Sequence, residues 1–228
     1  MRPLDRYRTP ADLPRRIPVF PLPGALLLPR AGLPLNIFEP RYLRMVGDAM
    51  SGERIIGMVQ PAGPAAAGML ADAGARPPIY PIGCAGRITS YAETADGRFL
   101  IELTGICRFL VVSEPDCPTP YRQVDADFAS FASDLTTGQG EDQVNRCALI
   151  DTFRAYLEAR QLTADWSEVE AASTECLVNS LSVISPYPPE DKQALLEAPD
   201  LWNRAELLIA LTEIALSRQC GAAEPRLQ

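Results

Sequence analysis

The stretch Leu33-Pro-Leu-Asn-Ile-Phe-Glu-Pro-Arg-Tyr42 leads into the first predicted helix. Pro40 suits the first position of a helix, where its missing N–H costs nothing, and Glu39 before it occupies the capping position. Apolar side chains then recur at the spacing of one buried helix face, at Tyr42, Met45, Val46, Ala49 and Met50. The pattern predicts one short amphipathic helix that stops at Ser51-Gly52.

Toward the N-terminus the chain is rich in proline. Residues 1–16 combine Arg and Pro without periodicity, and we expect them to form a flexible lead-in. Order is expected to begin at Ile17-Pro-Val-Phe-Pro-Leu-Pro23, because proline fixes φ and keeps the preceding residue extended. Since proline cannot donate a hydrogen bond to a neighbouring strand, this segment is predicted to be an edge strand.

Toward the C-terminus the pattern becomes that of a β-rich unit, which we place at residues 17–132. Residues 54–59 read as a buried strand, and residues 61–78, mostly Ala, Gly and Pro, read as a surface loop. Two long strands are expected at 79–91 and 98–113, joined by a hairpin at Asp96-Gly97. Alternating polar and apolar residues at 121–128 predict a further half-buried strand.

Helical periodicity replaces this pattern after a predicted linker at 133–140. We expect a helical bundle at 141–220 and a tail at 221–228. The first helix should bury Val144, Cys147, Ile150, Phe153 and Leu157. The second should open with the capping box Ser167-x-x-Glu170 and bury Val169, Ala172, Cys176 and Leu181. The third should start at Pro188-Pro189, and the fourth should be capped by Asp200, bury Leu201, Ala205, Leu208 and Leu211, and end before Gly221.

The chain contains no histidine, which restricts its chemistry more than any other feature of its composition. Histidine is the usual general base near neutral pH and the commonest metal ligand. Its absence excludes Ser-His-Asp and Cys-His nucleophile systems, HExxH sites and histidine-ligated zinc deaminases. The single lysine, Lys192, follows Pro188-Pro189 and is predicted to be a solvated residue in the first turn of a helix.

The net charge of −8 arises in the C-terminal part of the chain. Residues 1–138 carry 14 acidic and 14 basic side chains, whereas residues 139–228 carry 15 acidic and 7 basic ones. Nucleic-acid binding draws on the neutralisation of phosphates, so an acidic chain without a lysine-rich run argues against DNA and RNA as partners. The same argument disfavours an acidic membrane surface.

Six cysteines are scattered along the chain without a Cys-x-x-Cys pair. Structural zinc requires closely spaced ligands, so we expect no metal site, and no motif calls for another cofactor. The N-terminus lacks the apolar core of a signal peptide, and no run of about 18 uncharged apolar residues occurs. These features predict a cytoplasmic protein whose thiols are reduced and buried.

Several of these segments together resemble one known family. They are Ile17-Pro-Val-Phe-Pro-Leu-Pro23 with Leu28-Pro29, Leu33-Pro-Leu-Asn-Ile-Phe-Glu-Pro-Arg-Tyr42, Asp96-Gly97-Arg98, Gly105-Ile-Cys-Arg-Phe109 and Asp191-Lys-Gln-Ala-Leu-Leu-Glu-Ala-Pro199. They are similar to the N-terminal substrate-binding domain of Lon proteases, which also occurs as a stand-alone protein and is related to the N-terminal part of cereblon. The resemblance covers about residues 17–218.

The resemblance implies an α+β fold, with a PUA-like, twisted and partly closed β-barrel and one short helix, followed by a C-terminal four-helix bundle. It also implies a module that binds exposed apolar segments of polypeptides, with Lon or another protease as a further partner. Full-length Lon carries an ATPase module with a Walker lysine and a Ser-Lys peptidase domain. Because 228 residues with one lysine leave no room for either, we expect no enzyme activity.

Six residues of the resembling motifs are candidates for contact with a bound segment. A sheet edge offers backbone hydrogen bonds, and an apolar groove offers area. The candidates are Phe20, Leu22, Phe38, Glu39, Arg41 and Tyr42. The apolar candidates have the alternative of being core residues, and Glu39 and Arg41 have the alternative of capping and pairing at the helix start.

Other classes of protein stay open at this point. The acidic helical half is also compatible with a regulator or adaptor that docks on a protease, although a charge excess is more often a solvated surface. RNA binding is suggested only by PUA-like folds in other families, and the acidic balance opposes it. A hydrolase that uses only carboxylates would need two acids about 5–9 Å apart in a cleft.

Overall fold

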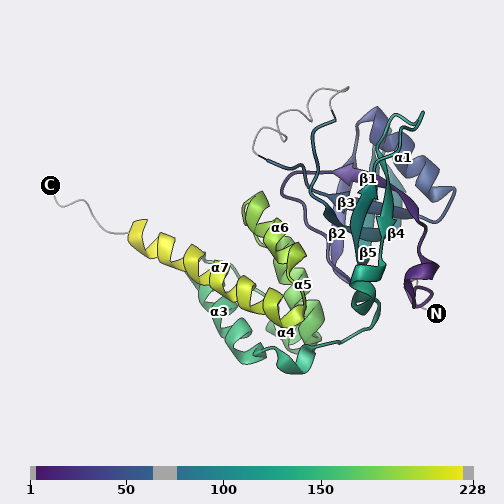
Figure 1. The fold of residues 1–228 in the computed structure, drawn as a ribbon. Coiled ribbons are helices and arrows are strands. Elements are labelled where there is room, and N and C mark those ends of the chain that lie inside the picture. The colour runs from purple at the N-terminus through teal and green to yellow at the C-terminus, as the bar shows by residue number, and fades with distance from the viewer. Residues whose placement is uncertain (1–3, 64–75, 223–228) are drawn as a thin grey trace.

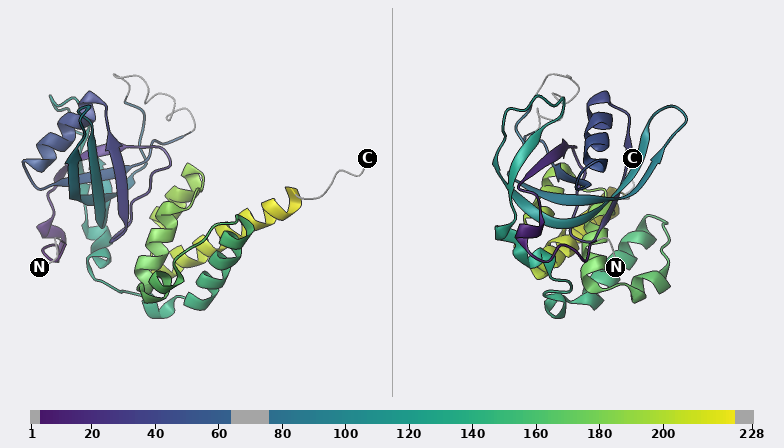
Figure 2. Two further views of the ribbon diagram at one scale, coloured as in Figure 1. Left: turned by 180° about the vertical axis from the view of Figure 1, so that it is seen from behind. Right: turned by 90° about the vertical axis from the view of Figure 1, so that its right-hand side faces the viewer.

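The structure, a computed structural model, describes residues 4–63 and 76–222. These residues form a sheet lobe with one α-helix and a helical lobe built from the C-terminal elements (Figure 1). Seen from behind, the last helix, α7 (Leu201–Ala222), extends away from the sheet lobe (Figure 2). The α+β class predicted from the sequence is confirmed.

The described part of the sheet lobe has six strands, five of which close into a ring. They are β1 (Arg16–Pro21), β2 (Gly32–Ile37), β3 (Ile55–Val59), β4 (Ile82–Glu93), β5 (Phe99–Ser113) and β6 (Gln123–Asp127). Their order is β2-β5-β4-β3-β1-β6, and β6 also pairs with β5. Five strands therefore form a closed ring, and β2 lies outside it against β5.

Strand β1 is not an edge strand, which corrects the prediction made from its prolines. Residues 16–18 pair with β6, and residues 19–21 pair with β3 on the other side. The two neighbours are staggered along β1, so each half of the strand has one pairing partner. Pro18 and Pro21 each stand at the last position of one of these paired segments, where a missing N–H disturbs the ladder least.

The hairpin between β4 and β5 turns where the Asp96-Gly97 pair predicts it. Gly97 has a φ of +77°, in the left-handed region that glycine adopts without strain. The N–H of Gly97 donates to the carbonyl oxygen of Thr94 at 2.9 Å, and the N–H of Thr94 donates to that of Arg98 at 2.9 Å. The predicted long antiparallel pair is therefore confirmed, with the turn setting its register.

Apolar side chains fill the interior of the ring. Ile17 and Val19 of β1 meet Phe109 of β5 and Val124 of β6, and all four are fully buried. The ring of Phe109 lies 5.9 Å from that of Phe128, centroid to centroid. Full burial of such a side chain stabilises the fold by about 1.5–3 kcal/mol. The inside of the ring is therefore a packed core.

Helix α1 (Pro40–Met50) has the predicted bounds and covers the outer face of the sheet. Its buried side chains are Tyr42, Met45, Val46 and Ala49, which confirms four of the five predicted core positions. Glu39 occupies the N-cap position, but its side chain makes no capping hydrogen bond. Its Oε2 accepts a hydrogen bond from Nε of Arg41 at 2.9 Å instead.

The described part of the helical lobe contains five α-helices, where the sequence predicted four. They are α3 (Arg146–Ala159), α4 (Trp166–Ala171), α5 (Thr174–Ile184), α6 (Pro189–Glu197) and α7. The predicted second helix is divided, because Ser173 caps a new helix, α5. The predicted capping box at Ser167 is wrong, because Asp165 caps α4. Asp165 Oδ1 accepts from the N–H of Ser167 at 3.0 Å, and Ser173 Oγ accepts from the N–H of Cys176 at 3.2 Å.

The buried face of α3 also differs from the prediction. Leu149, Phe153 and Tyr156 are buried, whereas Cys147 is exposed. These three residues lie on one helical face, as the five predicted residues also do, so periodicity alone could not decide which of the two faces is buried. Later in the lobe, α6 begins at Pro189 as predicted, and Asp200 Oδ1 accepts from the N–H of Asn203 at 2.8 Å at the start of α7.

Helix α7 runs to Ala222, so Gly221 lies inside it and does not follow its end. In the described part of the chain, no helix is both long and apolar enough to span a membrane.

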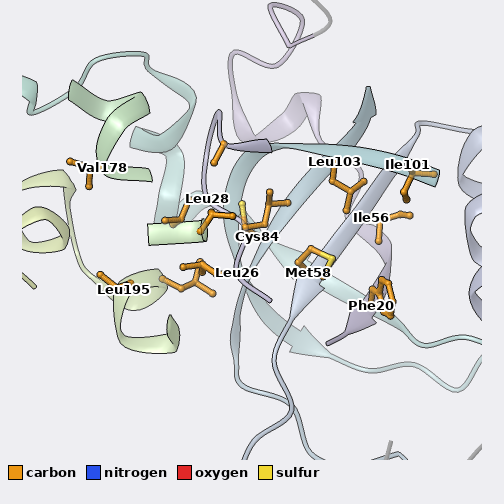
Figure 3. Packing of buried hydrophobic residues seen from close by; sticks show 14 of the residues in the cluster. Phe20, Leu26, Leu28, Ile56, Met58, Cys84, Ile101, Leu103, Val178 and Leu195 are labelled. Atoms are coloured by element: carbon orange, nitrogen blue, oxygen red, sulfur yellow. The ribbon is translucent and has the colours of Figure 1, made fainter. Parts of the chain in front are cut away.

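The loop between β1 and β2 joins the two lobes. Leu26 and Leu28 lie between Val178 and Leu195 of the helices on one side and the sheet on the other (Figure 3). A Cβ on Gly105 would lie 2.0 Å from the carbonyl oxygen of Leu28, so this loop can cross β5 only where glycine stands. One apolar cluster therefore continues from the sheet into the helical lobe.

Two segments that we expected to be loosely attached carry buried side chains. Tyr7 and Leu13 of the expected lead-in are 4% and 6% exposed, and Nη1 of Arg87 donates to the hydroxyl of Tyr7 at 2.9 Å. Asp134 of the expected linker is also buried, at the end of the 3-10 helix η2 (Ala129–Leu135). Residues 64–75 of the expected loop and 223–228 of the expected tail lie outside the described residues.

Candidate functional site

Two of the six candidate contact residues, Phe20 and Tyr42, lie in the core. They are 7% and 5% exposed, and their ring centroids are 4.2 Å apart. The guanidinium carbon of Arg41 lies 4.6 Å from the centre of the Tyr42 ring, and Arg41 Nη2 lies 2.8 Å from Glu39 Oε2. Burial raises the pKa of the Tyr42 phenol. These four residues together build the start of α1.

Phe38 is placed differently, because 61% of it is exposed. It stands between the end of β2 and the start of α1. Leu22 is half-buried against the apolar cluster, and its N–H donates to the carbonyl oxygen of Val59 at 3.1 Å. The six candidates are therefore not gathered in one groove, and Phe38 offers the largest accessible apolar surface among them.

The outer edge of β2 has no strand partner among the described residues. The carbonyl oxygen of Ala31 accepts from the N–H of Gly105 at 2.9 Å, so the backbone groups of Ala31 point toward β5. In an antiparallel pair every second residue exchanges backbone hydrogen bonds with the neighbouring strand, so the backbone N–H and C=O groups of residues 33, 35 and 37 also point toward β5. The backbone groups of Gly32, Pro34 and Asn36 therefore point away from the sheet.

Partly exposed apolar side chains lie beside this edge. Leu33 and Leu35 of β2 share a sheet face with Phe99 of β5, whose ring lies 5.1 Å from that of Tyr91. Tyr91 is 40% exposed, and Leu100, on the opposite face, is 46% exposed. We call the free edge of β2 together with these side chains and Phe38 the β2 edge surface.

A second concave region lies between the N-terminal segment and strands β4 and β5. It is a groove of about 600 Å³ lined by Tyr7, Arg30, Thr89, Thr104 and Leu135 among others. The hydroxyl oxygens of Thr89 and Thr104 lie 2.8 Å apart and share a hydrogen bond. Part of the polar lining is therefore already satisfied within the protein.

Lys192 is buried, which corrects the prediction that it is solvated. It is 7% exposed, and its Nζ donates to the carbonyl oxygen of Val183 at 2.9 Å. The first turn of α6 is held against the sheet lobe, since Gln60 Nε2 donates to the carbonyl oxygen of Pro189 at 3.0 Å. Burial lowers the pKa of the Lys192 ammonium. Across residues 4–63 and 76–222, no group of three or more Asp, Glu or Cys side chains is arranged to hold a metal ion.

Arg108 connects the two lobes and was assigned no role by the sequence. It is 2% exposed, and its Nε and Nη2 donate to the two carboxylate oxygens of Asp134 at 2.8 and 2.9 Å. Its Nη1 donates to the carbonyl oxygens of Leu196 and Ala198 at 3.1 and 2.5 Å. One guanidinium therefore holds β5, η2 and the turn between α6 and α7. The signal for it was an arginine inside an apolar strand, within the motif Gly105-Ile-Cys-Arg-Phe109.

A cavity of about 210 Å³ lies beside this pair, where the lobes meet. Its lining includes Arg108, Asp134, Glu175, Trp202 and Arg204. The sequence did not predict a site here, because the lining comes from five separate segments of the chain.

Comparison with known proteins gives one family. The model of the ATP-dependent protease La (LON) substrate-binding domain matches residues 16–213. Lon protease 2 of Myxococcus xanthus is 25% identical over 212 residues, a match that covers 88% of this chain and 24% of the relative. Lon protease of Anaeromyxobacter dehalogenans is 24% identical over 209 residues, covering 88% and 23%. The chain thus spans about a quarter of the length of the curated relatives it matches.

Two solved structures share the fold. The Lon N-terminal domain protein from Xanthomonas campestris aligns with a TM-score of 0.56 and 20% identity, covering 86% of this chain and 97% of that one. The N-terminal domain of the Mycobacterium avium complex Lon protease aligns with a TM-score of 0.61 and 16% identity, covering 87% and 98%. At these identities the likeness establishes the fold alone.

Proposed function

The chain belongs to the family of LON substrate-binding domains, and from this premise we propose that it is a non-catalytic module that binds extended apolar segments of other polypeptides. The family description speaks of substrate binding, and the relatives are named as proteases. For this chain, the binding partner we propose is an exposed or unfolded protein segment that lies along the β2 edge surface.

The free edge of β2 is the observation that carries this proposal. Its outward carbonyl groups at Gly32, Pro34 and Asn36, and the N–H groups of Gly32 and Asn36, are available to an added strand. Each such hydrogen bond contributes about 0.5–1.5 kcal/mol net. Because these groups belong to the backbone, the edge accepts many sequences, as a module for varied clients requires.

Apolar side chains supply the second part of the affinity. A bound strand would place alternate side chains on the two faces of the sheet, beside Leu33 and Leu35 on one face. Leu100 of β5 and Tyr91 of β4 lie one and two strands further into the sheet, within reach of long apolar side chains only. Phe38 at the end of β2 is the most exposed of these aromatic side chains. Burial of this area favours apolar clients by about 25 cal/mol per Å² removed from water.

Pro34 limits how tightly the edge binds. It stands in the middle of the outward side and has no N–H, so an added strand lacks one hydrogen bond there. The same feature protects an exposed edge from pairing with a second copy of the chain. We therefore expect modest affinity and a monomeric free protein.

The contacts of the described residues support a non-catalytic role. Lys192 is the only lysine in the chain, and its Nζ donates to the carbonyl oxygen of Val183. No histidine is present to act as a base. A Ser-Lys or histidine-based mechanism thus has no accessible base in this chain.

Phe38→Asp and Val112→Asp form a matched pair of variants for testing the site. Phe38 and Val112 are 61% and 60% exposed, but Val112 lies toward the far end of β5, away from β2. Binding of a fluorescent apolar peptide is measured by anisotropy. We expect Phe38→Asp to weaken binding by about tenfold or more, equivalent to about 1.4 kcal/mol, and Val112→Asp to leave it unchanged.

Hydrogen exchange locates the peptide directly. The outward N–H of Asn36 should exchange quickly in the free protein and slowly when the peptide is bound, and Asn36→Pro should remove that protection and weaken binding. Protection at Thr89 and Thr104, with β2 unchanged, would move the site to the groove beside the N-terminal segment. A failure to bind any apolar peptide, together with one stoichiometric protein partner whose association rate falls steeply with salt, would replace the proposal by an adaptor role.

A further inference from the structure

Gly32 stands at the free edge of β2, although its backbone does not require a glycine. Its φ lies outside the left-handed region, and it pairs regularly with Thr104 of β5. A Cβ at this position would lie 2.8 Å from Oε1 of Glu102, which is closer than such atoms approach in proteins. The space that a side chain would take at the edge is therefore occupied by a carboxylate from the neighbouring strand.

The side chain of Glu102 leans from β5 toward this edge. In the ladder between β2 and β5, Glu102 is opposite Pro34, so Gly32 is its diagonal neighbour. The backbone of Glu102 lies one strand inside the edge, but its carboxylate lies over Gly32 on the outermost strand. The side chain is exposed to solvent. A negative charge is therefore placed beside the path of an added strand.

The carboxylate of Glu102 has no partner within the described part of the chain. No residue there donates a hydrogen bond to it or forms an ion pair with it. Arg98, at the hairpin of the same sheet, has its Nε 2.9 Å from Oδ2 of Asp96. Arg30, just before β2, is held by Glu175. Since these arginines are engaged elsewhere, the charge of Glu102 is free to pair with a bound molecule.

We propose that Glu102 selects, among the clients of the β2 edge surface, segments that carry a lysine or arginine beside their apolar residues; this inference rests on the function proposed above. Directly paired residues share a sheet face, so a client residue opposite Gly32 would lie on the Glu102 side, with its Cβ about 4.5–5.5 Å from the side-chain position of Gly32. The long side chain of lysine or arginine spans that distance to the carboxylate, whereas an acidic side chain is repelled.

The other positions along the edge favour apolar residues. A client residue opposite Asn36 shares a face with Leu100, and client residues opposite Leu33 and Leu35 lie on the other face beside those side chains. The preferred client is therefore a short apolar strand with a basic residue at one end. The net charge of −8 also attracts basic peptides at long range, so the test has to separate Glu102 from the charge of the whole chain.

Three fluorescent peptides of one design measure the charge preference by anisotropy. Each has five apolar residues between two identical end residues, which are Lys, Gln or Glu. A strand aligned with residues 32–38 then places one end residue opposite Gly32 in either strand direction. At low salt we expect the Lys peptide to bind about threefold more tightly than the Gln peptide, and the Glu peptide about threefold more weakly, as for an exposed ion pair. The differences should shrink as salt is added.

Glu102→Lys and Glu206→Lys form a matched pair of variants. Both replace an exposed glutamate and change the net charge by the same amount, but Glu206 lies on α7 in the helical lobe. We expect Glu102→Lys to reverse the order of the Lys and Glu peptides while the Gln peptide binds as before. Glu206→Lys should keep the original order. Circular dichroism and a thermal melt establish that both variants are folded.

Equal binding of the three peptides would overturn the role of Glu102. Equal effects of Glu102→Lys and Glu206→Lys would also overturn it, because the net charge of the chain would then explain the preference. Phe38→Asp separates this inference from the proposed function. Binding of the Gln peptide that is lost in Phe38→Asp, with no charge preference among the peptides, would keep the β2 edge surface and remove Glu102 from it. If none of the three peptides binds, both proposals are overturned.

Discussion

Replacing Asp134 by alanine leaves the Arg108 guanidinium buried without its carboxylate. The lost contacts are two charge-assisted hydrogen bonds of 2.8 and 2.9 Å, and a third from the backbone N–H of Arg108 at 3.0 Å. Removing one partner of a buried pair costs about 3–5 kcal/mol, since the remaining charge stays out of water. For a chain of this size, that corresponds to a fall in Tm of about 6–20 °C.

Urea denaturation followed by circular dichroism measures this loss, with Asp151→Ala as the control. Asp151 lies 3.8 Å from Arg154 in an exposed pair, and its removal should change the free energy of unfolding by less than about 1 kcal/mol. The double variant Arg108→Met with Asp134→Leu should be more stable than Asp134→Ala, because no charge is then left unpaired. An equally small loss of unfolding free energy in Asp134→Ala and Asp151→Ala would refute a stabilising role for the buried pair.

Three further predictions follow from burial. Gly105→Ala should destabilise the fold by about 3 kcal/mol or more in urea denaturation, since its Cβ would lie 2.0 Å from the Leu28 carbonyl oxygen. The control Gly47→Ala lies in a helix, and its Cβ would have no atom within 4 Å, so this variant should be more stable by about 1 kcal/mol. In maleimide labelling with peptide mapping, exposed Cys147 should react in the native protein, and Cys84 and Cys107 only on unfolding, because burial raises the pKa of both thiols. Burial and the Asp48 carboxylate raise the pKa of Tyr121 to about 12. The contribution of this phenol to stability is therefore present below pH 10 and is lost as the pH rises toward 12. In an ultraviolet titration, the phenol that ionises at the highest pH should be missing from Tyr121→Phe.

Local sequence patterns predicted the structure correctly where the backbone geometry of a few neighbouring residues determines it. The Asp96-Gly97 turn and the Pro40 helix start depend on backbone geometry within a few residues, and both were predicted correctly. Ser173 shows the limit of periodicity, since its side chain caps a new helix inside a segment whose pattern predicted one continuous helix.

Contacts between segments that are far apart in the sequence could not be predicted from local patterns. Lys192 and Arg108 are buried because α6 and the α6–α7 turn pack against the sheet lobe, which no local pattern reveals. The same holds for the cavity at Arg204. For the candidate contact residues, the sequence identified the right motif, but the alternation of core and exposed positions within it, Tyr42 buried and Phe38 exposed, follows from the way α1 leaves β2.

Strand β5 links the proposed binding edge to the junction between the lobes. Its first half, residues 99–104, holds β2 in register, and its second half carries Gly105 and Arg108, which fix the β1–β2 loop and the helical lobe. The strand that presents the β2 edge is therefore anchored at its other end by a close backbone crossing and a buried ion pair. An edge held in this way loses little conformational freedom when a client binds, and so more of the hydrogen-bond and apolar free energy appears as affinity.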